Sequence, residues 1–172
     1  MSIEKKAEIV KSAEYKAPAT LEDFQAVERM DESQIMEELQ GKQIDKLFYE
    51  FTQGNRQVIA LSWAGVKYFA IQLGHIQVQE VKLDETEDSY RVIAWAYDKT
   101  KDLRVMGAAE QSKFLAWDTK KKDEFALAKA VSKGQRNALR NLIPETMISS
   151  AYAEWKLRLA KAKPINPLSP QK

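Results

Sequence analysis

The chain has 172 residues, of which 44% are hydrophobic and 30% are charged, and its formal net charge is +2. Such a length and composition are typical of one globular domain with a buried core. The absence of cysteine excludes disulfides and thiolate metal sites. No apolar run resembles a signal peptide or a membrane span, so we expect a cytoplasmic protein that does not bind membranes.

Positive charge is concentrated in the second half of the chain. Residues 1–54 carry 7 basic and 12 acidic side chains, whereas residues 99–142 carry 11 basic and 5 acidic ones. Such an asymmetry is expected when one face of a protein meets a polyanion. The acidic first half could shield that face, regulate it or contact a neighbouring subunit.

The N-terminal part of the chain predicts loose structure followed by two helices. Residues 1–20 are charged and rich in alanine without a sustained apolar stripe, so we expect a flexible segment. Thr20 has the character of an N-cap, with Asp23 in the position of its capping partner. A second helix, capped by Asp31 or Ser33, is expected to follow the first.

The centre of the chain predicts a hairpin, a short helix and a three-stranded meander. Residues 47–51 and 56–61 alternate around a turn that contains glycine. Ser62 is expected to cap a helix that stops at Gly74. The alternation of apolar and polar residues then predicts three antiparallel strands, at residues 76–83, 90–97 and 103–109.

A long helix and a terminal helix complete the expected domain. The long helix runs from Asp123, a candidate N-cap, to about Leu142, where Pro144 ends it and favours a new helix over residues 145–163. A helix segregated to one face of an antiparallel sheet makes an α+β domain. The expected organisation is a flexible N-terminus, one α+β domain and a flexible proline-rich tail, at residues 1–20, 21–163 and 164–172.

The long helix carries two stripes at helical spacing, roughly 200° apart. One stripe is small and apolar, so we expect it to dock on the sheet, with a packing reason for its glycine, Gly134. The other is a row of four cations without an interposed carboxylate, which would offer a positive ridge to a polyanion. An ordinary solvated basic face is the alternative. The cations are Lys129, Lys133, Arg136 and Arg140.

The segment from Ala128 to Leu142 follows the predicted meander at residues 76–109. Together they resemble the single-strand annealing recombinases, above all the Rad-fifty-two-like group and its small phage and prokaryotic relatives. Residues 61–67 also look like a segment of small phage-type annealing proteins, and the resemblance covers roughly residues 45–145. It implies a β-β-β-α core and assembly into rings or filaments. It also implies single-stranded DNA bound in a positively charged groove, with roles in DNA recombination and repair.

The same resemblance implies DNA contacts on the helix and on the meander. The acidic turn at residues 84–88 would be a poor place for DNA, so the groove should avoid it. Carried over by position, the nucleic-acid-binding cations are Lys129, Lys133, Arg136 and Arg140 on the helix and Arg91, Lys99, Lys101 and Arg104 on the meander.

Aromatic side chains are the second class of candidate, because single-stranded nucleic acids stack their bases on them. Trp117 lies in the connection at residues 113–122, among lysines, and is the best stacking candidate. Core packing is the more ordinary role for the other aromatic residues considered. These are Trp63, Trp95, Trp155, Tyr90 and Tyr97.

Nothing in the sequence favours catalysis or a cofactor. His75, the one histidine, follows a helix stop and is expected to be a partly exposed loop residue. The acidic residues at 84–88 lack the spacing of a calcium loop, and there is no glycine-rich phosphate loop. We therefore expect a non-enzymatic protein without metal or cofactor.

The sequence thus predicts an oligomeric protein that binds single-stranded DNA and anneals complementary strands without ATP. The alternative is an oligomeric protein-interaction or structural module of a virus or plasmid system, in which the acidic half and the terminal helix form interfaces. A metal-dependent nuclease is disfavoured, because no convincing carboxylate cluster is present.

Overall fold

The computed structural model describes residues 14–162, and the chain divides into two compact units. Residues 17–144 form the larger unit, which holds all the described strands and all but one of the described helices. The other unit holds α5 (Glu145–Ala162). The predicted α+β class is confirmed for the described residues. The predicted flexible tail, and most of the predicted flexible N-terminus, lie outside them.

The first described helix, α2 (Leu21–Leu39), is continuous where the sequence predicted two helices. The capping box at its start is confirmed, because the Thr20 hydroxyl accepts from the Asp23 backbone N–H and the Asp23 carboxylate accepts from that of Thr20. Neither predicted second cap acts as one. The carboxylate of Asp31 is buried and bonded to other elements, and the hydroxyl of Ser33 donates to a carbonyl within α2.

The predicted hairpin and short helix are confirmed as β1 (Phe48–Gln53), β2 (Arg56–Leu61) and α3 (Trp63–Leu73). Gly54 supplies the positive φ of the hairpin turn, at 59°. The Ser62 hydroxyl caps α3 by accepting from the Gly65 N–H at 3.0 Å, and Gly74 ends the helix in the left-handed region.

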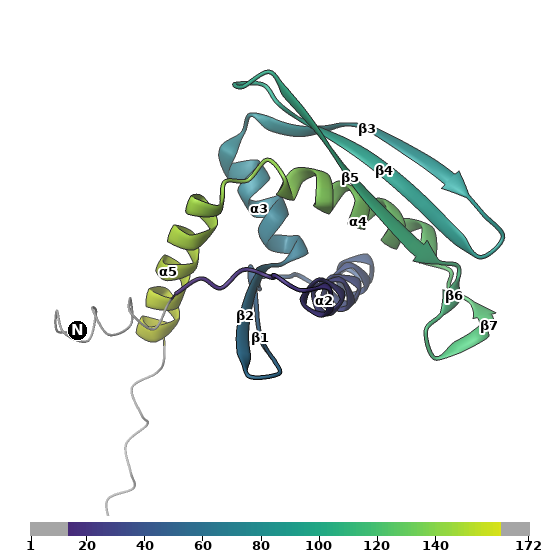
Figure 1. Ribbon diagram of the computed structural model, residues 1–172, viewed down its shortest axis with the longest axis horizontal. Helices are drawn as coiled ribbons and strands as arrows, with labels where there is room; N and C mark the ends of the chain where they lie inside the picture. Colours follow the sequence, from purple (N-terminus) through teal and green to yellow (C-terminus); the bar gives the residue numbers. More distant parts are fainter. Residues whose placement is uncertain (1–13, 163–172) are drawn as a thin grey trace, which may run out of the picture. The chain divides into compact units, whose positions relative to one another are not determined.

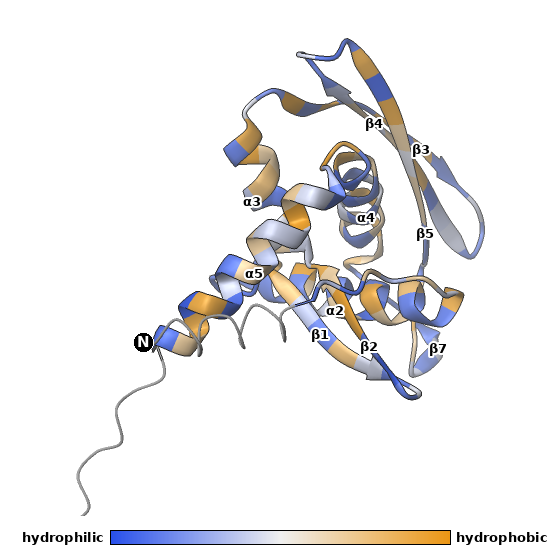
Figure 2. Cartoon of the chain, turned by 60° about the vertical axis from the view of Figure 1, so that its left-hand side comes forward, coloured by the Kyte–Doolittle hydropathy of each residue, from blue (hydrophilic) through white to orange (hydrophobic). Residues whose placement is uncertain are grey.

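The meander is an antiparallel sheet of β3 (Ile76–Glu85), β4 (Ser89–Asp98) and β5 (Leu103–Ser112), in that order. Helix α4 (Ala126–Arg140) covers one of its faces (Figure 1). Hydrophobic and hydrophilic residues alternate along the strands (Figure 2). Every second residue of β4 from Val92 to Asp98 is buried on the α4 side, and the residues between them point to the open face.

The connection after β5 contains a small hairpin that the sequence did not predict. It consists of β6 (Phe114–Leu115) and β7 (Asp118–Lys122), and it extends beyond the end of the sheet (Figure 1). A two-residue strand is too short to produce an alternating pattern. The predicted N-cap Asp123 is also wrong, since α4 begins at Ala126 with Phe125 as a cap residue that makes no side-chain bond.

Helix α4 packs unusually close to the sheet at two glycines. A Cβ atom on Gly134 would lie 2.6 Å from Cγ1 of Val92, and one on Gly107 would lie 2.1 Å from the backbone nitrogen of Ala138. Both distances are too short for real atoms. The predicted packing reason for Gly134 is therefore confirmed, and Gly107 supplies the matching gap on β5.

In the smaller unit, α5 carries an aromatic cluster. The ring of Tyr152 lies 6.3 Å from that of Tyr15 and 5.9 Å from that of Trp155. Such tilted aromatic pairs add to the stability that burial provides. None of the helices in the described part of the chain is both long and apolar enough to cross a bilayer.

We predict that Gly107→Ala destabilises the protein by about 1–3 kcal/mol or more, because the added methyl group meets backbone atoms of α4 that cannot move aside. Urea denaturation measures the change. Met106→Ala is the control, since the neighbouring Met106 side chain is 62% exposed. Equal stability of the two variants would contradict the close packing.

A second prediction concerns acid stability. The Ala19 backbone N–H, with Arg56 and Thr20, lowers the pKa of Asp23 from 3.8 to about 2 in the folded state. A lowered carboxyl pKa stabilises the fold above the unfolded value, and this contribution disappears as the pH falls through the folded value. Asp23→Asn should therefore be less stable at pH 7, with the deficit shrinking between pH 5 and pH 2. Urea denaturation at several pH values measures the stability of this variant, with Glu22→Gln at an exposed site as the control. A loss of stability that stays the same at every pH would contradict the prediction.

Candidate nucleic-acid interface

The cation stripe of α4 does not form an exposed ridge, which corrects the sequence-based expectation. Lys129 and Lys133 are only 9% and 6% exposed. The ammonium of Lys129 lies 2.7 Å from the Asp123 carboxylate. That of Lys133 forms an ion pair with Glu32 of α2 and a 2.9 Å bond with Gln111 of β5. These two cations stabilise the fold and are not available to a polyanion.

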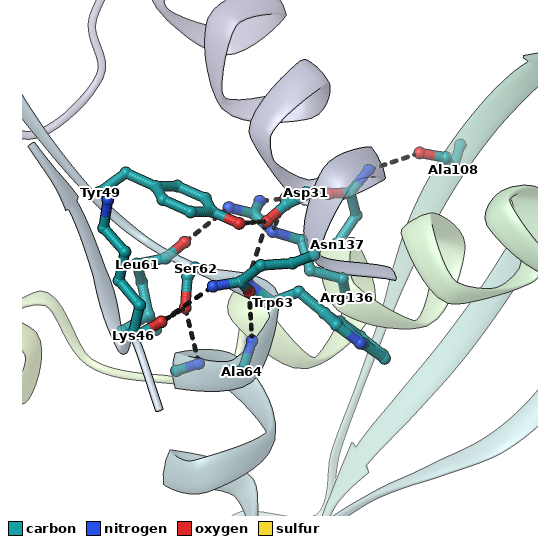
Figure 3. A network of polar contacts seen from close by, with 12 residues as sticks. Asp31, Lys46, Tyr49, Leu61, Ser62, Trp63, Ala64, Ala108, Arg136 and Asn137 are labelled. Carbon is teal, nitrogen blue, oxygen red and sulfur yellow. Dashed lines mark hydrogen bonds and ion pairs between the residues drawn. The ribbon is translucent and has the colours of Figure 1, made fainter. Parts of the chain in front are cut away.

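Arg136 lies at the centre of a buried polar network (Figure 3). Its Nε is 2.9 Å from the Asp31 carboxylate, and its guanidinium donates to the Leu61 carbonyl at 3.0 Å. Asp31 also accepts from the Tyr49 hydroxyl and from the Trp63 backbone N–H, each at 2.9 Å. The network joins α4 to α2, to the β1–β2 hairpin and to the start of α3.

Burial shapes the protonation of this network. Burial raises the pKa of Asp31, whereas the Arg136 charge and the donors Tyr49 and Trp63 act in the opposite direction. Burial also raises the pKa of Tyr49, and the adjacent Asp31 carboxylate adds to the effect. Tyr49 therefore keeps its proton and remains a donor to Asp31.

The C-terminal half of α4 reaches the surface at an open pocket of about 220 Å³. Asn137 and Asn141 donate their side-chain amides to the carbonyls of Ala108 and Met106, at 2.8 and 3.1 Å, and so cover part of the outer edge of β5. The pocket places Arg140 where an outside anion can approach. Its lining consists of Phe24, Val27, Glu28, Arg136, Asn137, Arg140 and Asn141.

The four candidate cations of the meander are exposed. Arg91 and Arg104 lie on the open face, and each has a carboxylate partner, Glu110 at 3.3 Å for Arg91 and Glu80 for Arg104. Lys99 and Lys101 lie in the turn between β4 and β5. The acidic turn at 84–88 is at the other end of the sheet, because it joins β3 to β4.

The β6–β7 hairpin carries Trp117, which is the most exposed of the large hydrophobic side chains in residues 14–162. Trp117 lies between the two strands and is 82% exposed. Lys120, Lys121 and Lys122 of β7 are also exposed, and within residues 14–162 none of the three forms a salt bridge. The hairpin therefore combines a free aromatic ring with three unpaired cations.

The other aromatic candidates have different surroundings. Trp63 is buried, and its indole N–H donates to Glu38 at 2.7 Å. Trp155 belongs to the cluster on α5. The remaining three lie on β4: Tyr90 beside Lys113, and Trp95 and Tyr97 on the open face.

His75 is partly exposed, as predicted, and its Nδ1 lies 3.0 Å from the buried Asp98 carboxylate. Thr100 bonds to the same carboxylate and, with other partners that include His75, holds the pKa of Asp98 well below its usual range. The pair therefore fixes the start of β3 against the β4–β5 turn. Across residues 14–162, no three histidine or acidic side chains come together in a way that could hold a metal ion.

We predict that Arg136→Met destabilises the protein by about 3–5 kcal/mol, because it leaves the Asp31 carboxylate buried without its cation. The pKa of Asp31 then rises further. A carboxyl group with a raised folded pKa becomes less costly as the pH falls through that value, so the deficit should be smaller at pH 5 than at pH 8.

Urea denaturation at both pH values measures this effect. Adding Asp31→Asn should recover part of the loss, since the amide oxygen still accepts from Tyr49 and the charge is gone. Arg158→Met, at a side chain that is 78% exposed, is the control. A deficit that does not depend on pH, and is not relieved by Asp31→Asn, would contradict the assignment.

No family model matches this sequence, and no curated protein matches it either.

Proposed function

We propose that the protein binds single-stranded DNA and anneals complementary strands without ATP, as a homo-oligomer that acts in recombination and repair. The observation that supports this best is the β6–β7 hairpin, where Trp117 is 82% exposed beside Lys120, Lys121 and Lys122. The resemblance of residues 45–145 to annealing proteins, with strands β3 to β5 followed by α4, agrees with it.

The hairpin suits single-stranded nucleic acid better than duplex. A tryptophan ring can stack on an unpaired base, a contact worth about 1–3 kcal/mol, whereas the base faces of a duplex are already stacked. The lysines neutralise phosphates and release counterions. The Trp117 ring is 82% exposed, so a ligand that covers it would remove apolar surface from water, which favours binding.

The proposal no longer depends on the α4 cations as a group. Lys129, Lys133 and Arg136 are engaged in ion pairs within the fold. Arg140 lines the open pocket and donates to the Ile143 carbonyl at 3.3 Å. The remaining candidates are Lys99 and Lys101 in their turn, together with Arg91 and Arg104 on the open face.

An exposed strand supports the oligomeric part of the proposal. Strand β3 lies at the edge of its sheet. Val81 and Leu83 pair with Ala94 and Val92 and therefore face the α4 side, yet they are 36% and 48% exposed. Apolar side chains on an exposed edge strand are a site for another strand or helix to cover. A second copy of the chain would cover them in a ring or filament.

In this proposal, annealing depends on many DNA-binding sites, one set per copy of the chain, arranged along one DNA strand. Cations hold the phosphates while the bases stay accessible, so a complementary strand can pair without first opening hairpins. Oligomerisation multiplies the sites and raises the effective concentration of each. No nucleotide hydrolysis enters this mechanism.

We predict that Trp117→Ala weakens binding of a labelled single-stranded oligonucleotide by about 1–3 kcal/mol, with unchanged thermal stability. Replacing Lys120, Lys121 and Lys122 with Gln should flatten the slope of log affinity against log salt by about 0.7 per lost phosphate contact. Fluorescence anisotropy measures both effects. Lys42→Gln, at an exposed site outside the hairpin, is the control. Unchanged affinity in both hairpin variants would remove the main support for this function.

Annealing and assembly have their own test. Two labelled complementary strands should pair faster with the protein alone, and neither ATP nor a chelator should alter the gain. Light scattering should report a mass several times 19.7 kDa. A protein that assembles but binds no oligonucleotide would instead fit an oligomeric interaction or structural module.

A further inference from the structure

The open face of the β3–β4–β5 sheet carries large apolar side chains that no other helix or strand of residues 17–144 covers. Ile93 and Met106 are 40% and 62% exposed, and Trp95 lies between them, half-buried. Trp95 pairs with Glu80 on β3 and with Met106 on β5, so it stands in the middle row of the sheet. An aromatic ring in this position presents a platform on a rigid element.

Two cations lie over the Trp95 ring, so a base that stacks on the ring must displace at least one of them from it. The Nζ of Lys82 lies 5.1 Å and the Cζ of Arg104 lies 5.2 Å from the ring centroid, within the range of cation–π contact. Glu80 binds both cations, as an ion pair with Arg104 and with its carboxylate 3.5 Å from Lys82. The hydrogen bond from Arg104 lowers the pKa of Glu80, and the charge of Lys82 adds to this effect. Glu80 therefore stays ionised and holds the two cations close to the ring.

Charge is distributed unevenly along this face. At the end of the sheet near the β4–β5 turn, the exposed carboxylates are Glu80 and Asp102, and Asp102 accepts from the Tyr97 hydroxyl at 2.6 Å. The exposed cations there are Lys99, Arg104 and Lys101, the last of which lies 3.4 Å from the buried Asp98 carboxylate. Lys82 pairs with Ile93 in the middle of the sheet. At the opposite end the acidic turn at 84–88 repels anions. Within the open face, an anionic ligand is therefore favoured at the Trp95 end, whereas the hairpin cations lie beyond the acidic end of the sheet.

We infer that this end of the open face is a second single-stranded DNA site, in which one base stacks at Trp95 and the flanking phosphates bind Arg104 and Lys82. The inference rests on the proposed function but concerns a different surface. It requires a ligand that carries both π-faces and closely spaced negative charges, and single-stranded nucleic acid has both. The site differs from the hairpin, which follows the other end of β5.

The geometry assigns Glu80 a competing role. In the free protein its carboxylate occupies the two cations that a phosphate would bind, so DNA must displace Glu80 from at least one of them. Removing the negative charge at Glu80 should therefore strengthen binding, whereas removing the cations or the ring should weaken it. A site in which these side chains only stabilise the sheet would not respond with opposite signs.

Six residues of β5, from Met106 beside Trp95 to Ser112 at the end of the strand, separate this site from the hairpin side by roughly 20 Å. One oligonucleotide can cross that distance only if it is long enough, and it would pass the acidic end of the sheet. A short oligonucleotide therefore samples each site separately. This makes the length of the probe a variable that distinguishes the two surfaces.

The test uses the full chain and a short fluorescent oligothymidylate, with an abasic oligonucleotide of the same length as the matched probe. Because the hairpin binds the same probe, the comparison is made in a Trp117→Ala background, where Trp95→Ala should weaken oligothymidylate binding by about 5- to 100-fold and leave abasic binding nearly unchanged. Trp95→Phe should retain most of the affinity. Lys82→Gln with Arg104→Gln should weaken binding of both probes, and Glu80→Gln should strengthen both. Thermal denaturation of each variant shows whether the fold is intact.

The outcomes separate this inference from the proposed function. If the hairpin variants lose affinity while Trp95→Ala and Glu80→Gln, made in the Trp117→Ala background, bind as their parent does, the open-face site is wrong and the proposed function stands. If the unmodified protein binds neither probe, both fall. If Trp95→Ala changes the mass in light scattering without changing affinity, the face is an interface between copies, and the inference is overturned. If Trp95→Ala unfolds, the opposite effects of Glu80→Gln and Lys82→Gln decide the question.

Discussion

The arrangement of this fold depends on α4 being enclosed on two sides. On one side it meets the sheet so closely that Gly107 and Gly134 leave no room for a Cβ atom. On the other side its cations meet carboxylates from an earlier part of the chain, as Arg136 does with Asp31. Removing an ion from such a pair leaves the other charge buried, which is costly. The helix is therefore held by packing against the sheet and by charge against α2.

This enclosure pairs two carboxylates of the acidic N-terminal segment, Glu32 and Asp31, with cations of the basic helix. The acidic N-terminal segment and the basic third quarter of the chain compensate each other within one molecule, through contacts such as Lys133 with Glu32. Of the roles considered for the acidic half, shielding of the basic helix is the one that the fold contains. A surplus of lysines in the sequence thus overstates the positive charge that the surface presents.

The sequence predicted those features whose signals are local. Ser62 and Gly74 bound α3 because a cap and a left-handed stop act on their own helix. Asp31 was misread as a cap, since its partners Tyr49 and Trp63 lie on other elements and leave no mark near it in sequence. The α4 cations were misread for the same reason. The absence of a carboxylate within the helix says nothing about carboxylates that the fold brings to it.

The residues that we propose to bind DNA follow the same distinction. Trp117 could be found from sequence, because it lies among lysines outside any alternating strand. Trp95 looked like a core residue, because β4 is apolar on both faces and the pattern does not say which face a helix covers. One signal was present, however. The α4 side of the sheet has small residues such as Ala94, Ala96 and Gly107, which fit a close helix, whereas the other side has the large rings.

The two faces of the sheet differ, with small residues against α4 and large residues on the open face. Helix α4 uses its charges and its small face to hold the fold together. The proposed contacts with a polyanion therefore lie on elements that contribute less to the stability of the fold. The β6–β7 hairpin and the open face of the sheet meet that condition, since they lie outside the contacts of α4. Substitutions there should change binding without changing stability, whereas substitutions on α4 change stability first. A loss of binding caused by an α4 variant is therefore not evidence that its side chain touches the ligand.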